Sequence, residues 1–281
     1  MINPSSSPQQ FHNDGFSITA AEPWFKVKVK VLQSYVQTFI TQALGKSDAL
    51  VYVDLSAGSG LYSHGHQKEI FASASLSALA SGWPFSQWVL CEHHAEEAAA
   101  LRSRVQRHFR GQNVAVLDHH PDELAEKLRP FTLSAKDRRR VVTLCVVDPF
   151  SFDVNFALIR KLAEAGFNFL IPFTFSLNAR QDYIYYLQEH PEKVKRFLGA
   201  QDLHRLQGVE SNLQFYKRLV RIYQNNMLML GLNTTLTMHR ADSQLMDLPA
   251  YYVGFFSRQL SVRSLQRDVR EAEIEQLNLF L

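Results

Sequence analysis

The sequence predicts a single α/β domain with three layers, in which helices cover both faces of a doubly wound, mostly parallel sheet of seven strands. The chain has 281 residues, a length that suits one large domain. Short apolar runs alternate with helical stretches, and several runs are apolar on both faces, as strands buried between two helix layers must be. With 46% hydrophobic and 20% charged residues, a disordered chain and a coiled coil are excluded.

The first elements are an arm and a helix. Residues 1–22 are rich in Ser, Pro and Gln and lack periodicity, so we expect a flexible N-terminal arm ahead of a domain over 23–281. Apolar residues then recur every four positions, which predicts a helix from Trp24 to Leu44 that Gly45 ends.

Strands and helices then alternate. The apolar runs predict strands over 49–55, 88–92, 113–118, 141–148 and 167–175. The stretches between them predict a helix that begins near Ala72 and helices over 94–109, 122–128 and 154–166. Residues 61–71 have no place in this alternation and are expected to form an insertion.

A helical insertion over about 178–230 precedes the last two strands, 232–240 and 251–258, which should pair antiparallel at the sheet edge. A polar helix over 261–276 should follow. Lys and Arg alternate with Tyr and Phe in the insertion, a composition that favours RNA or DNA as a partner. Many of these aromatic residues must also be core, because paired helices bury one side.

A glycine turn follows the first predicted strand in 51-VYVDLSAGSG-60. The strand ends in Asp54, and Ala57, Gly58 and Gly60 follow. Small residues after a parallel strand let a nucleotide approach the backbone closely, in the crevice beyond the carboxyl ends of the strands. A purely structural turn is the alternative.

Acids end the next three strands: Glu92, Asp118 and Asp148. Glu92 is placed to accept hydrogen bonds from a ribose, and Asp118 from an adenine amino group. Strand by strand, this set resembles the class I S-adenosylmethionine-dependent methyltransferases, in which the glycine turn holds the amino-acid end of the cofactor. NAD fits less well, because the turn lacks the full G-x-G-x-x-G.

Four segments resemble a narrower family, the three-Cys-motif partner proteins (TcmP). They are 28-KVKVLQSYV-36, the glycine turn itself, 146-VVDPFS-151 and 251-YYVGFFSR-258. The resemblance implies a Rossmann-like methyltransferase fold with an antiparallel last strand, and a separate cysteine-motif protein as partner. The chain departs from the family pattern at Ser59, where proline is usual, at Ser151, where glycine is usual, and in 73-SASLSAL-79, which lacks the expected glycine–serine–proline.

Asp148, Pro149 and Phe150 are the candidate catalytic residues. In methyltransferases that act on amino groups, an acid and a proline carbonyl orient the amine and an aromatic ring stacks on the flipped base. Alternatively, Asp148 caps a helix that starts near Phe152. Lys28 on the opening helix could close over the cofactor, or lie on a solvated helix face.

Other classes of function are disfavoured. The longest apolar run, 141-VVTLCVV-147, is far shorter than the roughly 20 residues of a membrane span, so we expect no membrane contact. Cys91 and Cys145 lie in apolar runs, which indicates buried thiols in a reducing, cytoplasmic setting. The triplet Asp118-His119-His120 lacks the further acids of a two-metal phosphoesterase, and no metal is expected.

Two hypotheses of different class remain. The first is an S-adenosylmethionine-dependent methyltransferase whose favoured acceptor is an amino group on a nucleic-acid base. The second is a methyltransferase-like interaction module, weakly active or inactive, that acts with a cysteine-motif partner in defence or mobile-element biology.

Overall fold

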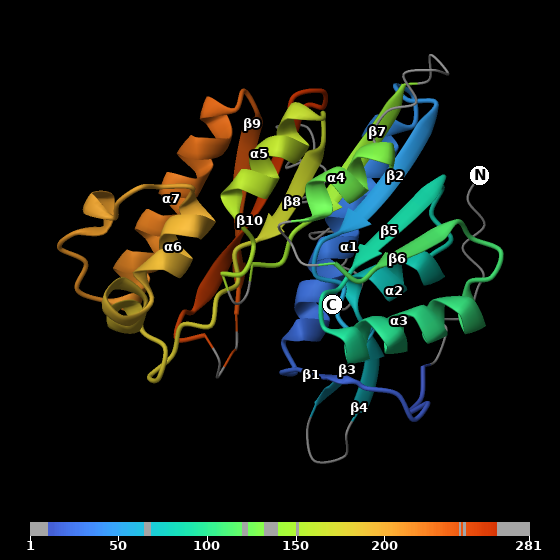
Figure 1. Cartoon of the computed structure of the whole chain (residues 1–281), viewed down its shortest axis with the longest axis horizontal. Helices are drawn as coiled ribbons and strands as arrows, with labels where there is room; N and C mark the ends of the chain where they lie inside the picture. The colour runs from blue at the N-terminus through green and yellow to red at the C-terminus, as the bar shows by residue number, and fades with distance from the viewer. Residues whose placement is uncertain are drawn as a thin grey trace, which may run out of the picture.

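A seven-stranded sheet forms the centre of the protein (Figure 1). The computed structural model describes residues 11–64, 69–119, 123–131, 140–149, 152–241, 243 and 246–262. The sheet has the order β6-β5-β2-β7-β8-β10-β9. Its strands are β2 (Ala49–Asp54), β5 (Gln87–Cys91), β6 (Val114–Leu117), β7 (Val141–Val146), β8 (Asn168–Pro172), β9 (Asn233–Arg240) and β10 (Ala250–Ser257).

The predicted fold class is confirmed. Neighbouring strands from β6 to β8 are parallel, and only β10 runs antiparallel to both of its neighbours in the sheet. β10 is the last strand in the described residues and lies between β8 and β9, so β9 forms the sheet edge. The chain reverses direction across the sheet beside β2, and this puts the carboxyl ends of β2, β5 and β7 around one crevice.

Helices cover the sheet on both faces. They are α1 (Phe25–Ala43), α2 (Ala74–Ala80), α3 (Ala95–His108), α4 (Leu124–Leu128), α5 (Phe156–Glu164), α6 (Pro191–Leu198) and α7 (Asn212–Met229), with short turns at Arg129–Phe131, Tyr185–Glu189 and His204–Leu206. α1 contacts α2 on one face, and α4 to α7 contact one another in succession on the other (Figure 1). β2 and β5 are almost wholly buried between these layers, as runs that are apolar on both faces predict.

The N-terminal segment differs from the expected flexible arm. Among residues 11–22, β1 (Thr19–Ala20) pairs in parallel with β3 (Leu61–His64), which pairs antiparallel with β4 (Glu69–Ala72). The stretch 61–71, expected as an insertion, therefore supplies most of a second, three-stranded sheet. Asp14 also forms an ion pair with the buried Arg104 of α3. These contacts hold residues 11–22 across the glycine turn.

The helical insertion lies between β8 and β9, where the sequence predicts it. Its aromatic residues face mostly inward: Tyr186, Phe215, Tyr216 and Tyr223 are buried, and Tyr223 packs on Phe156 and Phe197. The predicted helix over 261–276 lies outside the described residues from 263 on. Both cysteines are buried and free, and no helix in the described part of the chain is long and apolar enough to cross a bilayer.

Candidate functional site

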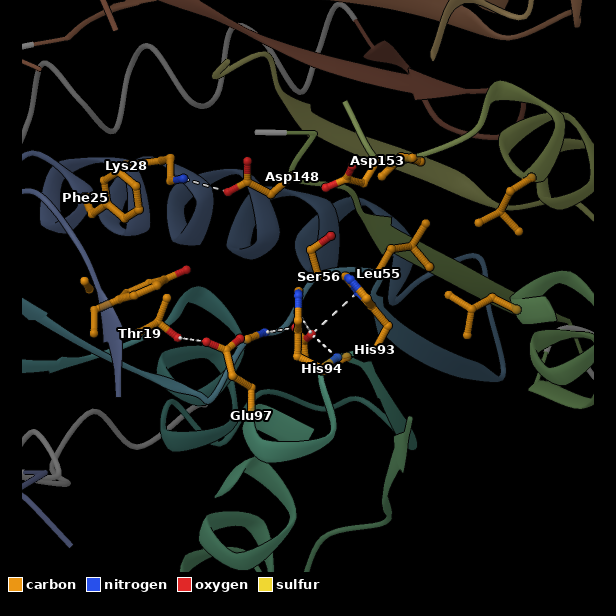
Figure 2. Close-up of a pocket in the computed structure, with 17 residues that line it drawn as sticks. Thr19, Phe25, Lys28, Leu55, Ser56, His93, His94, Glu97, Asp148 and Asp153 are labelled. Atoms are coloured by element: carbon orange, nitrogen blue, oxygen red, sulfur yellow. Dashed lines mark hydrogen bonds and ion pairs between the residues drawn. The ribbon is translucent and has the colours of Figure 1, made fainter. Parts of the chain in front are cut away.

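A pocket of about 290 Å³ opens at the carboxyl ends of β2, β5 and β7 (Figure 2). Four groups of residues form it. The turn after β2 contributes Leu55, Ser56 and Gly58, and the segment after β5 contributes Glu92, His93, His94 and Glu97. The β7 end and α5 contribute Asp148, Asp153, Val154 and Leu158. The remaining wall is Thr19, Ala20, Phe25, Lys28, Tyr62 and Leu124.

The glycine turn is held from two sides. Gly58 has φ +61°, a left-handed conformation that glycine adopts without strain, and its backbone N–H donates to Glu92 Oε2 at 3.0 Å. From the other side, Arg104 donates to the carbonyl of Ser59 at 2.6 Å, while its guanidinium is bound by Asp14. The turn is therefore fixed before a ligand arrives, with Gly58 at the pocket wall.

Glu92 is buried directly behind this turn. Its second oxygen, Oε1, accepts the backbone N–H of His94 at 2.8 Å and lies 2.9 Å from His94 Nδ1. The His93 ring lies against the His94 ring at a tilt of 42°. The ligand atoms of Glu92, His93 and His94 lie within 4.8 Å of one another, the one such group of metal-ligand types found in the described residues. Backbone N–H groups already satisfy both oxygens of Glu92, so this geometry does not require a metal ion.

Asp148 and Lys28 form an ion pair along one wall of the pocket, and the Asp148 side chain keeps 20% of its surface exposed (Figure 2). Lys28 Nζ donates to Asp148 Oδ2 at 2.6 Å, and Thr174 Oγ1 donates to Oδ1 at 3.0 Å. Lys28 is only 3% exposed, and its ammonium lies 4.1 Å from the centre of the Phe25 ring. Lys28 can be buried inside the site because the carboxylate of Asp148, 120 positions later in the sequence, balances its charge.

Asp54 and Ala57 line a smaller cavity of about 20 Å³, which shares Lys28 and Asp148 with the main pocket. Ser75 Oγ and the backbone N–H of Ser56 donate to the Asp54 carboxylate. Burial nevertheless raises the pKa of Asp54 to about 6. Through the hydrogen bond from the Ser56 N–H, Asp54 holds the start of the glycine turn from behind.

The other predicted site residues lie elsewhere. Gly60 is buried behind the turn with φ +87°, and a side chain there would meet Leu76 and Leu101. Asp118 is half-exposed and bonds to Arg102 at 3.2 Å, which holds the pKa of its carboxyl below the usual range. It is not among the residues that line the pocket. Pro149 is buried, and its carbonyl accepts the N–H of Phe152. Phe150 lies outside the described residues.

Sequence reasoning missed several pocket residues, notably Thr19, Phe25, Tyr62 and Glu97. Phe25 lies three positions before Lys28, hence on the same face of a helix, and that spacing is a usable signal. Glu97 lies in the first turn of the helix after Glu92, where side chains reach the strand end. Thr19 and Tyr62 carry no such signal, because the pairing of β1 with β3 creates their position.

The pocket lining combines apolar side chains with carboxylates. Phe25, Leu55, Leu124, Val154 and Leu158 supply apolar surface, while Glu92, Glu97, Asp148 and Asp153 supply carboxylates. Glu97 also accepts a hydrogen bond from Thr19, which ties β1 to α3. An elongated ligand with a flat apolar part, hydroxyl groups and a positive charge would match this lining.

Solved structures resemble the chain, whereas neither a protein-family model nor a curated protein matches its sequence. A Legionella pneumophila protein described by family model DUF519 aligns with a TM-score of 0.50 at 11% identity, over 87% of this chain and 91% of that one. Cofactor-bound Rv0187 from MTB gives 0.43 at 14% identity, over 85% of this chain and 91% of that one. An rRNA methylase from Streptococcus thermophilus gives 0.40 at 10% identity, over 80% of this chain and 95% of that one. Together with the strand order, the first likeness shows a Rossmann-like methyltransferase fold.

Proposed function

We propose that the chain is an S-adenosylmethionine-dependent methyltransferase and that the pocket at the glycine turn holds the cofactor. The observation that carries this proposal is the convergence of Gly58, Glu92 and Asp148, from three strand ends, on one pocket. Gly58 would lie beside the methionine end, and Glu92 would accept the ribose hydroxyls. The cofactor supplies an electrophilic methyl group on a sulfonium.

The residues present fit this cofactor by their chemistry. The carboxylates of the lining suit a sulfonium and an ammonium, and the apolar surface near Leu124 suits the adenine, with Asp118 beyond it at the end of β6. A lysine ammonium has three N–H donors, and one of those of Lys28 is hydrogen-bonded to Asp148. The other two are free to bind the cofactor carboxylate.

The acceptor in this proposal is an amino group on a nucleic-acid base, oriented by Asp148. Lys28 and Thr174 each donate to one oxygen of the carboxylate and fix its plane. Each oxygen keeps a second lone pair that can accept an N–H from the amine. Because the proton can leave after methyl transfer, a carboxylate needs only to align the amine, and alignment alone can supply roughly 7–11 kcal/mol. Pro149 and Phe150 follow Asp148 as the expected carbonyl and aromatic ring.

One observation favours the second candidate, an interaction module that acts with a cysteine-motif (TcmP-type) partner. Both oxygens of Asp148 already have donors within the protein, so the pair with Lys28 is also complete as a purely structural feature. In that case the chain would keep the pocket and transfer no methyl group.

Single-turnover transfer of a labelled methyl group to RNA and DNA separates the two. Asp148→Ala should keep cofactor binding and lose turnover by about a hundredfold or more, since misplaced reactants cost that much. Asp202→Ala removes an exposed carboxylate outside the pocket, so it is the matched control and should retain the wild-type rate. Near-normal turnover in Asp148→Ala would place the chemistry elsewhere, and cofactor binding without any transfer by the wild type would favour the interaction module.

A further inference from the structure

A second concave surface lies between α5 and α6. It is an open depression of about 410 Å³. Its lining has small residues between polar and charged ones: Asn155, Ala157, Arg160, Glu192, Lys195, Arg196, Gly199, Ala200 and Gln201. We refer to this surface as the α5–α6 groove.

The floor of the groove is held rigidly. Gly199 ends α6 with φ +63°, and a side chain at this position would lie 2.7 Å from Phe156 Cδ1. Only glycine lets the two helices approach this closely. Asn155 caps the first turn of α5 through the N–H of Ala157, so both helix ends beside the floor are fixed.

The groove carries a net positive charge. Lys195 binds Glu192 at 2.8 Å, and these two charges offset each other. Arg160 and Arg196 are exposed, and no residue in the described ranges forms an ion pair with either. Two guanidinium groups, each with several donors, are thus available to an anion.

The groove adjoins the mouth of the candidate cofactor pocket. Residues 153, 154 and 158 of the α5 region line the pocket, whereas residues 155, 157 and 160 line the groove. Lys193 of α6 lies 3.9 Å from Asp153 at the pocket rim, which links the two surfaces. A chain-like ligand held in the groove can therefore extend to the pocket.

The burial of the aromatic residues decides how such a ligand is held. Base stacking needs exposed rings, but Tyr186, Phe215, Tyr216 and Tyr223 of the insertion are buried. Its partly exposed rings, Tyr183 and Tyr185, do not line the groove. The groove instead offers guanidinium groups, amide side chains and a floor of small residues. These groups match phosphates and sugars rather than bases.

We propose that the α5–α6 groove binds the phosphate backbone of a single-stranded nucleic acid and directs the strand toward the pocket. This inference rests on the proposed function, since it identifies how the nucleic-acid acceptor is held. Arg160 and Arg196 each contact a phosphate, and the contact does not depend on base sequence.

The test is the salt dependence of binding to fluorescein-labelled single-stranded RNA and DNA oligonucleotides, measured by anisotropy. Each phosphate contact on a single strand contributes about −0.7 to the slope of log K against log salt. Arg160→Gln with Arg196→Gln should make the slope shallower by about 1.4, so a fourfold rise in salt weakens the wild type about sevenfold more than the variant. Lys46→Gln with Arg110→Gln removes the same charge beside the amino ends of β2 and β6, and should leave the slope unchanged.

Calorimetry with S-adenosylmethionine on the same variants separates this proposal from the proposed function. Unchanged cofactor binding with a shallower salt slope supports both. If the wild type binds the cofactor but no oligonucleotide, or if all variants give the same salt slope, the proposed role of the groove is wrong. The proposed cofactor pocket is unaffected by either result. If the protein binds oligonucleotides through the groove but does not bind the cofactor, the proposed methyltransferase function is wrong instead. If polyglutamate at equal charge concentration displaces the oligonucleotide, the groove binds an acidic protein, and the proposal of a nucleic-acid ligand is wrong.

Discussion

The ion pair of Lys28 and Asp148 makes the sharpest prediction about stability. At 2.6 Å, two opposite charges attract by about 6 kcal/mol if the effective dielectric constant is near 20. Desolvation costs several kcal/mol for each ion, so the intact pair is close to neutral in stability. Loss of one partner is different, because the other charge is left unpaired, and Lys28 is then a buried charge without compensation.

We therefore expect Asp148→Asn to lower the free energy of unfolding by about 3–5 kcal/mol, because the buried Lys28 ammonium loses its partner. Lys28→Met should lower it by less, because Asp148 is 20% exposed and keeps the hydrogen bond from Thr174. The double variant should cost at least about 2 kcal/mol less than the sum of the two single variants. Methionine preserves the apolar stem over Phe25, so packing changes little. Urea denaturation with a common slope measures all three values.

The neighbouring ion pair of Lys26 and Glu69 is the control for this cycle. Its side chains are 35% and 56% exposed, and solvent-exposed pairs couple by less than about 1 kcal/mol. Lys26→Met with Glu69→Gln should therefore be nearly additive. If Lys28 and Asp148 were equally additive, the two charges would not depend on each other, and the account of how Asp148 is oriented would be wrong.

Three further predictions concern the residues behind the pocket. The raised pKa of Asp54, about 6, means that the folded protein holds this proton more tightly than the unfolded chain. Stability should fall by about 2 kcal/mol as pH rises from about 4 to neutral, and Asp54→Asn should remove this fall in urea titrations at both pH values. Arg104→Leu should cost about 3–5 kcal/mol and speed amide exchange in residues 11–20, because Asp14 loses its partner; unchanged exchange would contradict the role given to this pair. Gly60→Ala should lower the melting temperature, since its methyl group would lie 2.7 Å from Leu76 Cδ1.

The fold could be predicted because its signals are local. Runs such as 141–148, apolar on both faces, indicate buried parallel strands, and periodicity places α1 to within a residue or two. The edge of the sheet was predictable for the same reason, since β9 and β10 follow the helical insertion directly. Short-range patterns predict these elements, and the topology rules for parallel sheets predict how they are arranged.

The site was only partly predictable, because its contacts join distant segments. Gly58, Glu92 and Asp148 follow strand ends, so the sequence places them at one edge of the sheet. The bond between Lys28 and Asp148 spans 120 positions, and no local pattern reveals it. Likewise, the polar composition of residues 11–22 predicts an arm, whereas the pairing of β1 with β3 makes this segment a wall of the pocket.

Isothermal titration of S-adenosylmethionine into the wild type, Gly58→Val and Gly82→Val tests the central claim most directly. Both glycines have φ near +60°, so valine strains the backbone equally, but a side chain at Gly82 meets nothing within 4 Å and this position is outside the pocket. We expect micromolar binding by the wild type and Gly82→Val, and at least a tenfold loss in Gly58→Val with cooperative unfolding retained. No binding by the wild type, or equal affinity in all three, would contradict a cofactor site at the glycine turn.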